Sequence, residues 1–290
     1  MVELGRVGIW TDQLDRLPAA ELRDTLKEVE SAGFRSIWLG EGRNGREAFT
    51  NATLVLAVTE RLLVANGVAS IHARHAAASA SAQRVLTEAF PHRFLLGLGL
   101  GHDGLVSAPI DDERTAMKRY LRGVDVQPAG VLPAPPAPPP RVIAAWDVEM
   151  LEIARDHAQG AHPSLMPPEH TRLAHEILGP GRVLAPEQGV MLEEDPEHAR
   201  LILREELATR LVHPTYRETL TRLGWTDGDL SGGGSDALID RVFAWGSLSD
   251  VAKRVEEHLE AGADSVALHV LPGRSGPLLL DGWHALAALL

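Results

Sequence analysis

Two stretches of the sequence, AGFRSIWLG at residues 32–40 and AGADSVALH at residues 261–269, follow one design and decide the fold class. The first comes after Leu22, Leu26 and Val29, whose spacing is typical of a helix. In both stretches a glycine suited to a left-handed helix cap precedes a short turn and a run of apolar residues. Because a strand without polar alternation is buried on both faces, the stretches predict a parallel sheet covered by helices.

The alternation of strand and helix continues along the whole chain. Strands are predicted at residues 6–11, 36–41, 62–69, 94–101, 141–146, 160–165, 183–191 and 265–270. Units of this kind close naturally into a (β/α)8 barrel, and 290 residues suit that fold. We therefore expect an α/β protein, with residues 1–290 forming a single (β/α)8 TIM barrel domain.

Two segments interrupt this regular pattern. Seven of the thirteen residues from 128 to 140 are proline, which predicts an extended connector over residues 127–140 rather than a strand. The stretch 195–246 is too long for one helix and contains SGGGSD at 231–236. It predicts a helical insertion before the last strand, placed to cover the mouth of the barrel.

Composition excludes several classes of protein. A net charge of -12 argues against a nucleic-acid partner, which would need a clustered basic surface. The chain lacks both an apolar run long enough for a membrane span and a secretory signal, so we expect a cytoplasmic protein. The absence of cysteine excludes disulfides, thiol nucleophiles and cysteine-ligated metals.

Residues 99–104 read as the GxGxxG of a dinucleotide-binding turn. The helix that should follow is missing, because Pro109 and a run of acids indicate a loop. The sequence therefore argues against NAD. Without side chains, Gly97, Gly99 and Gly101 would let a flat ligand approach the inner wall of the barrel, or they would serve tight packing within it.

The active site of such a barrel lies at the carboxyl ends of its strands, and polar or aromatic residues follow almost every predicted strand. The candidates are Trp10, Thr11, Asp12, Glu41, Ser70, His72, His102, Trp146, Asp147, His162, Glu187, Gln188 and His269. A metal site would need three or four such ligands to converge, and the sequence places no such set, so no metal is expected.

Longer stretches carry a resemblance to a known family. They are GIWTDQLD at 8–15, SIWLGEGRNGREAFTNATLVLA at 36–57, RLLVANGVASIHARHAAASASAQRVLTEAFPHRFLLGLGLGH at 61–102, GAHPSLMPPEHT at 160–171, LGPGRVLAPEQGV at 178–190 and DLSGGGSDALIDRVFAWG at 229–246. On these residues the chain resembles the luciferase-like monooxygenase superfamily, in the branch that uses the deazaflavin coenzyme F420. FMN members share the barrel, so FMN remains the alternative cofactor.

The resemblance implies a barrel of the bacterial-luciferase type, usually a homodimer, acting on a small-molecule substrate. The third strand of the family ends in a bulge with a cis peptide against the cofactor ring, and this motif corresponds to Gly67-Val68. The family's acid after strand two corresponds to Glu41, and its polar residue after the strand-four glycines corresponds to His102. We expect His102 to act as the catalytic acid, with Glu41 orienting it or donating the proton itself.

The resemblance also implies a set of cofactor contacts. The expected residues are Trp10, Asn66, Gly67, Val68, Ala69, Gly99, Gly101, Trp146, His162, Ser164, Met166 and Thr171. The helix that begins within residues 164–171 would hold the cofactor phosphate. Asp147-Val148 departs from the Gly-Pro turn common in the family, and an acid there would repel a phosphate.

Three functions remain open at this point. The first is an F420-dependent oxidoreductase that transfers a hydride to or from a C=C, C=N or C=O bond. The second is an FMN-dependent luciferase-like monooxygenase. The third is a cofactor-free barrel that acts as a binding or structural protein.

Overall fold

The structure of the chain is a computed structural model that describes residues 3–42, 45–101, 112–126, 138–272 and 279–290. His102 and most of the expected proline-rich connector lie outside the described residues. None of the described helices is long and apolar enough to span a bilayer.

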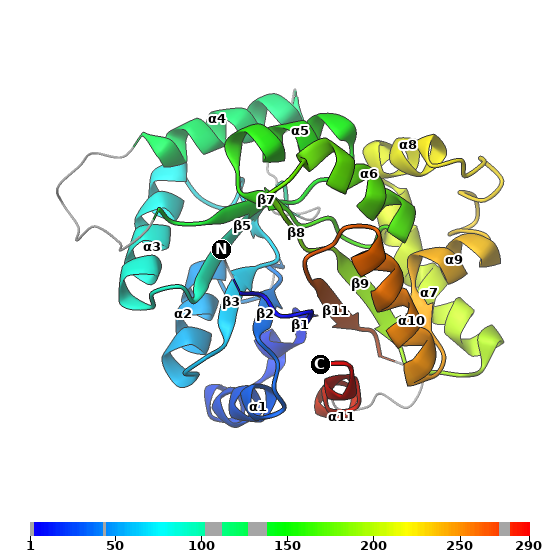
Figure 1. Cartoon of the computed structure of the whole chain (residues 1–290), viewed down its shortest axis with the longest axis horizontal. Coiled ribbons are helices and arrows are strands. Elements are labelled where there is room, and N and C mark those ends of the chain that lie inside the picture. Colours follow the sequence, from blue (N-terminus) through cyan, green and yellow to red (C-terminus); the bar gives the residue numbers. More distant parts are fainter. Residues whose placement is uncertain (1–2, 43–44, 102–111, 127–137, 273–278) are drawn as a thin grey trace.

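The described strands form one curled sheet in which every pairing is parallel (Figure 1). The strands are β1 (Val7–Thr11), β2 (Ser36–Leu39), β3 (Leu63–Asn66), β4 (Ala69–Ser70), β5 (Phe94–Gly99), β6 (Arg141–Ile143), β7 (Gly160–Ala161), β8 (Val183–Leu184), β9 (Glu187–Met191), β10 (Ala244–Trp245) and β11 (Val266–Val270). Pairing runs in the order β10-β9-β11-β1-β2-β3-β5-β6-β7-β8, and β4 also pairs with β5. The predicted α/β barrel is confirmed.

Two predicted strands are each split into two pieces. The third is interrupted at residues 67–68, between β3 and β4. The seventh is interrupted at Ala185 and Pro186, between β8 and β9, where proline has no N–H for a ladder. Since β8 pairs with β7 and β9 pairs with β11, this one stretch links the β7 side of the sheet to the β11 side and closes the barrel.

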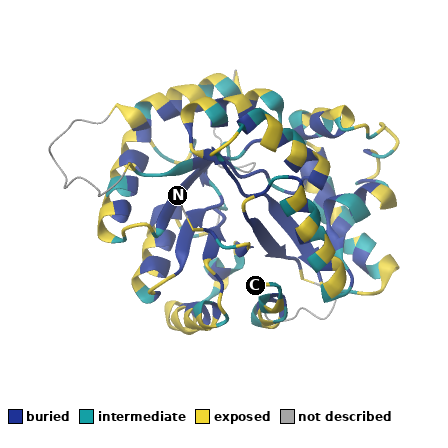
Figure 2. Cartoon of the chain, in the orientation of Figure 1, coloured by how far each residue is buried: buried dark blue, intermediate teal, exposed yellow. Residues whose placement is uncertain are grey.

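Helices surround the sheet and turn their polar faces to solvent (Figure 2). Those of the barrel are α1 (Ala19–Ser31), α2 (Ala48–Val58), α3 (Ala76–Ala89), α4 (Glu113–Asp125), α5 (Val148–His157), α6 (Pro168–Leu178), α10 (Leu248–Glu260) and α11 (Leu279–Leu286). Short 3-10 helices span Gln13–Arg16 and Ala287–Leu289. Gly33 and Gly262, which follow α1 and α10, have φ values of 102° and 104°, so the predicted left-handed caps are present.

Residues 195–246 contain α7 (Pro196–Leu211), α8 (Pro214–Arg222) and α9 (Asp236–Val242), which lie together on one side of the barrel (Figure 1). These helices build a hydrophobic core with a few residues from the ends of the barrel strands. A second core lies between the strands and the barrel helices. A third fills the barrel interior and includes Trp10 and Trp38.

Candidate functional site

A bulge in the third barrel strand is the most unusual part of the backbone. The peptide bond between Gly67 and Val68 is cis, as the family resemblance implies. A Cβ atom on Gly97 would lie 1.8 Å from the carbonyl oxygen of Asn66, and one on Gly99 would lie 2.4 Å from Val68 Cγ2. The glycines of β5 therefore make room for the bulge, so tight packing accounts for Gly97 and Gly99 without a ligand.

Trp10 holds this bulge in place through its indole ring. Its indole Nε1 donates a hydrogen bond of 2.6 Å to the carbonyl oxygen of Gly67. A Cβ on Gly40 or on Gly67 would come within 3 Å of the indole ring. The expected cofactor contact of Trp10 is therefore at most indirect, because the side chain is only 4% exposed and lies against the bulge.

Half-buried residues beside the bulge form a small surface at the barrel mouth. They are Val68, Ala144, Trp146 and Ser164, and we call them the mouth surface. Val68 and Ala144 both approach Gly99, while Trp146 Nε1 lies 3.1 Å from the carbonyl oxygen of Ser164 and 3.2 Å from its hydroxyl. Tyr216 meets the Trp146 ring edge-on at 5.0 Å. The aromatic ring is thus held in place and still partly open to solvent.

Glu41 is buried next to the bulge, and its carboxylate accepts hydrogen bonds from described residues on several sides. Its carboxylate accepts from the backbone N–H groups of Ala48 at 3.1 Å and Ser70 at 2.8 Å. Arg74 binds both carboxylate oxygens, with one of the two contacts at 3.0 Å. This geometry favours a positioning role, in which Glu41 ties the start of α2 to β4, over the alternative of a proton donor.

His162 lies inside the barrel below the mouth surface. Its ring stacks on Trp38 at 4.1 Å, and Nδ1 donates to the carbonyl oxygen of Ala185 at 2.6 Å. Burial lowers the pKa of His162, although Glu187 and the hydrogen bond oppose this shift. A neutral imidazole packed in the core supports the wall of the site and does not reach its surface.

Several other expected cofactor contacts point away from the mouth. Asn66 donates from Nδ2 to the carbonyl oxygen of Ala48 at 3.2 Å, and Ala69 packs in the core between strands and helices. Met166 is buried against the α7–α9 helices. Thr171 is fully buried and its hydroxyl bonds to His258. The structure does not support direct cofactor contacts for these residues. Gly101, the last residue described before His102, is half-buried with φ 85°.

The N-termini of α6 and α5 offer few free N–H groups for the expected phosphate site. Helix α6 is preceded by Pro167 and begins at Pro168, neither of which has an N–H to offer. At the start of α5, Asp147 accepts from the backbone N–H of Met150 at 2.8 Å and lies 3.4 Å from Arg114. The N-terminus of α5 is therefore already capped by a negative group.

Glu187 and His269 form a contact that the sequence analysis did not predict. Both residues were among the strand-end candidates, but they are 82 positions apart in the chain. Pairing of β9 with β11 places Glu187 opposite Ala267, which brings its carboxylate to 2.9 Å from His269 Nδ1. The signal in the sequence was His269 within the apolar strand β11 and the polar residues Glu187 and Gln188 at the start of β9. Within the described ranges, no group of three potential ligands is placed to hold a metal ion.

A comparison with protein families assigns the chain. Residues 4–265 match the luciferase-like monooxygenase family. The chain belongs to this family. It is therefore an oxidoreductase of the luciferase-like type, built on the barrel described above.

Individual relatives are more distant. A 5,10-methylenetetrahydromethanopterin reductase from Methanolobus tindarius is 29% identical over 91 residues, which is 31% of this chain and 28% of the relative. An F420-dependent secondary alcohol dehydrogenase, solved with an F420-acetone adduct, has a TM-score of 0.74 at 12% identity over 98% of both chains. The FMN-bound oxygenating constituent of 3,6-diketocamphane monooxygenase from Pseudomonas putida has 0.66 at 13% identity, over 97% of this chain and 95% of its own. At such identities the solved structures share the fold.

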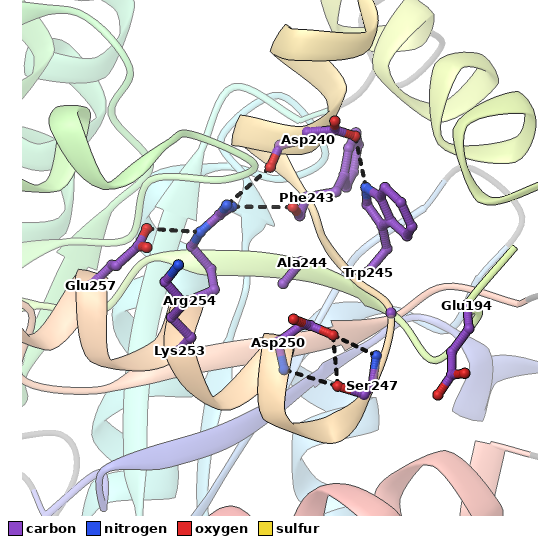
Figure 3. Close-up of a pocket in the computed structure, with 11 residues that line it drawn as sticks. Glu194, Asp240, Phe243, Ala244, Trp245, Ser247, Asp250, Lys253, Arg254 and Glu257 are labelled. Carbon is purple, nitrogen blue, oxygen red and sulfur yellow. Dashed lines mark hydrogen bonds and ion pairs between the residues drawn. The ribbon is translucent and has the colours of Figure 1, made fainter. Parts of the chain in front are cut away.

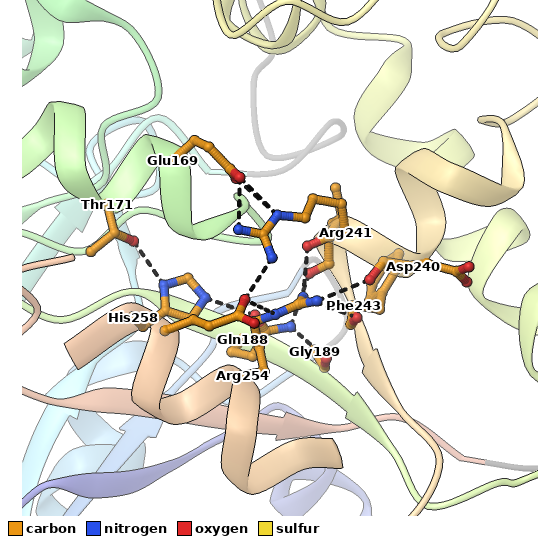
Figure 4. Close-up of polar contacts among 11 residues, drawn as sticks. Glu169, Thr171, Gln188, Gly189, Asp240, Arg241, Phe243, Arg254 and His258 are labelled. Carbon is orange, nitrogen blue, oxygen red and sulfur yellow. Dashed lines mark hydrogen bonds and ion pairs between the residues drawn. The ribbon is translucent and has the colours of Figure 1, made fainter. Parts of the chain in front are cut away.

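A fully buried chain of polar contacts holds the outer side of this luciferase-like barrel together (Figure 4). Thr171 Oγ1 lies 2.8 Å from His258 Nδ1, and His258 Nε2 lies 2.8 Å from Gln188 Oε1. Gln188 Nε2 then donates to the carbonyl oxygens of Gly189 and Val242. Since the amide oxygen only accepts, His258 must donate from Nε2 and accept from Thr171, which fixes the neutral tautomer.

The buried histidines predict a loss of stability in acid. Burial, with the positive charges of Arg254, Arg241 and His170, lowers the pKa of His258 from 6.5 to about 3. Burial also lowers the pKa of His170 to about 4, against the hydrogen bond to Trp146. The unfolded chain therefore binds more protons below pH 6.5, and each histidine removes about 1.4 kcal/mol of stability per pH unit as the pH falls toward its folded pKa.

Urea unfolding at several pH values between about 6.5 and 4 tests this expectation. His258→Gln should show a shallower fall in stability with decreasing pH than the wild type. The exposed His284, on α11, provides the matched control, because His284→Gln removes no buried imidazole and should keep the wild-type slope. If stability falls with decreasing pH equally steeply in His258→Gln and the wild type, the buried His258 is not a cause of the acid-induced loss.

A cavity of about 580 Å³ lies beside β10 and α10, apart from the mouth surface (Figure 3). Many of its polar groups are already paired: Asp240 accepts from Trp245 and Arg200, and Arg254 donates to backbone carbonyls and to Glu257. The side chains of Lys253 and Glu194 also line it. Asp250 is held by the cap of α10. Groups paired in this way offer a ligand few free partners, so the mouth surface is the stronger candidate site.

Proposed function

We propose that this chain is an F420-dependent oxidoreductase that transfers a hydride between the deazaflavin and a small organic substrate. The observation that carries the proposal is the bulge at Gly67-Val68, held by Trp10 and the β5 glycines beside the half-exposed mouth surface. A flat ring needs such a rigid wall to be held in one orientation. The F420-dependent secondary alcohol dehydrogenase of similar fold supports the choice of cofactor.

The residues at the mouth fit a planar, largely apolar ring. Val68 and Ala144 offer aliphatic surface, Trp146 offers an aromatic ring, and Ser164 offers a hydroxyl at the edge. When bound, the cofactor supplies the hydride. The chain would hold the ring against Val68 and shield it from water with Trp146, whose position is fixed by Ser164 and Tyr216. The role of His102 as the acid stays a prediction.

FMN is the second candidate, favoured by the FMN-bound structure of similar fold and by the acid at the start of α5. Titration of the purified protein with F420 and with FMN, followed by ring fluorescence, separates the two. We expect saturable F420 binding that is tighter than FMN binding. Tighter FMN binding would support the monooxygenase, and binding of neither would support a cofactor-free barrel.

A variant of the mouth surface tests where the ring binds. Trp146→Ala removes the aromatic wall and is expected to weaken F420 binding at least about fivefold, because aromatic contacts of this kind contribute about 1 kcal/mol beyond their buried area. Trp245→Ala is the matched control, since Trp245 is also half-buried but lines the separate cavity. Equal affinity for Trp146→Ala and the wild type would place the ring elsewhere.

The substrate we propose carries a C=O, C=N or C=C bond. Acetone, 1-pyrroline and cyclohexenone are suitable probes of the three bond types, with loss of reduced F420 as the readout. We also propose a homodimer, which light scattering of the purified protein tests directly.

A further inference from the structure

Glu187 and His269 form a buried pair at the mouth that none of the roles above uses. Their side chains come from β9 and β11, with 2.9 Å between His269 Nδ1 and Glu187 Oε1. Glu187 is 2% exposed and also pairs through its backbone with Ser164 of the mouth surface. A carboxylate that holds one imidazole nitrogen fixes the orientation of the ring and leaves the other nitrogen available.

Trp10 connects the Glu187–His269 pair to the bulge. His269 lies opposite Trp10 in the pairing of β1 with β11, and the two rings are 4.2 Å apart. Trp10 in turn binds the carbonyl oxygen of Gly67, at the cis peptide. The imidazole is therefore one indole ring away from the wall that would support the cofactor.

Other acid-base candidates in the described part of the chain are engaged or enclosed, since the unpartnered Nε2 atoms of His72 and His162 are buried. Glu41 is bound by Arg74 and two backbone N–H groups. His258 and His170 are fully buried in contacts on the outer side of the barrel. His269 differs from these, because its side chain keeps 9% exposure and no hydrogen bond from Nε2 to a described residue is present.

We propose that His269 is a catalytic acid-base residue that exchanges a proton with the substrate through Nε2, and that Glu187 is its positioning residue. This inference rests on the proposed hydride-transfer function. It goes beyond it by assigning the proton step to a pair of residues that the family resemblance did not indicate.

The proton and electron balance is simple. In the reducing direction, the hydride brings two electrons to the substrate carbon, and the double bond breaks toward its partner atom. His269, as the imidazolium, gives the Nε2 proton to that atom, which completes the C–H and O–H, N–H or second C–H bond. Solvent would then return a proton to His269, balanced by the proton that the oxidised cofactor would release to solvent.

Charges around the pair bear on its pH dependence. Burial opposes ionisation of Glu187, but the hydrogen bond from His269 and the charges of His269, Arg210 and His162 outweigh it and lower the pKa of Glu187. His162 directly follows β7, whereas Arg210 and Tyr216 belong to α7 and α8. The carboxylate is therefore expected to stay ionised while the imidazole exchanges its proton.

The activity test uses His269→Gln and Glu187→Gln with reduced F420 and the acetone, pyrroline and cyclohexenone probes. His269→Gln should lower kcat at least a hundredfold while the Kd for F420 changes less than about threefold, because proton transfer contributes about 10²–10⁴ in rate. His284→Gln is the matched control, because His284 also lies beside a glutamate, Glu28, on the exposed outer surface.

A second measurement needs neither cofactor nor substrate. In the cofactor-free wild type, ¹⁵N NMR of the neutral His269 ring should show a proton on Nδ1 and none on Nε2. Glu187→Leu removes the acceptor and should shift the ring toward the opposite tautomer. The tautomer of His269 therefore tests the role of the Glu187–His269 pair even if a glutamine variant folds poorly or no probe is reduced.

The outcomes separate the two proposals. Wild-type kcat in His269→Gln, or an Nε2–H tautomer in the wild type, would overturn the acid-base pair and leave F420 dependence intact. A wild type that binds no F420 would overturn the proposed function and this inference with it. The expected tautomer together with a selective loss of kcat would support both.

Discussion

Gly97→Ala is expected to displace the bulge and to destabilise the protein strongly. The new Cβ atom would lie 1.8 Å from the carbonyl oxygen of Asn66 and 3.0 Å from its carbonyl carbon. Both are backbone atoms of a buried strand, so no side-chain rotation relieves the overlap. Overpacking in a core costs about 1–3 kcal/mol when side chains can adjust, and we expect at least the upper end of this range here.

Urea unfolding and F420 titration measure the two consequences. We expect a lower free energy of unfolding and, in whatever fraction folds, weaker binding of F420, because the wall at Val68 has moved. Gly228→Ala is the matched control, since the nearest atom to its added Cβ, Thr226 Oγ1, would be 3.6 Å away. A Gly97→Ala protein as stable as Gly228→Ala would show that β5 and the bulge are packed differently.

Arg74→Met is expected to destabilise the protein by about 3–5 kcal/mol, because it leaves the carboxylate of Glu41 buried without its counter-ion. The side chains of Glu41 and Arg74 are only 5% and 11% exposed. Arg6→Met is the control: Arg6 and Glu256 form an ion pair on the surface, where such pairs contribute about 0–1 kcal/mol.

A double variant distinguishes the buried charge from lost packing. Glu41→Gln combined with Arg74→Met removes both charges, so part of the stability lost in Arg74→Met should return. Stability that is equal in the single and double variants would contradict the ion pair as the cause. Thermal or urea unfolding of the three proteins gives the comparison.

The fold was largely predictable because its determinants are local. Each repeat places a capping glycine such as Gly33 or Gly262 after an amphipathic segment and before an apolar strand. The breaks were less predictable. A strand of two residues such as β10 carries too little pattern to detect, and the predicted strand at 183–191 was not divided at Pro186.

The contacts of the candidate site were harder to predict than its residues. The strand-end rule selected Glu187 and His269 only as separate candidates. It could not pair them, because their contact depends on which strands are neighbours and on their register. The expected phosphate site over residues 164–171 could not take account of the contact between Thr171 and His258, because that contact depends on how α6 packs against α10.

The helices α7, α8 and α9 share a hydrophobic core that is distinct from the one beneath the barrel helices. Tyr216 of this unit contacts the ring of Trp146, whereas Trp10 and the β5 glycines contact the bulge. Natural selection can therefore vary the wall that carries Trp146 without rebuilding the wall formed by the bulge. Such modularity gives one scaffold a route to many chemistries.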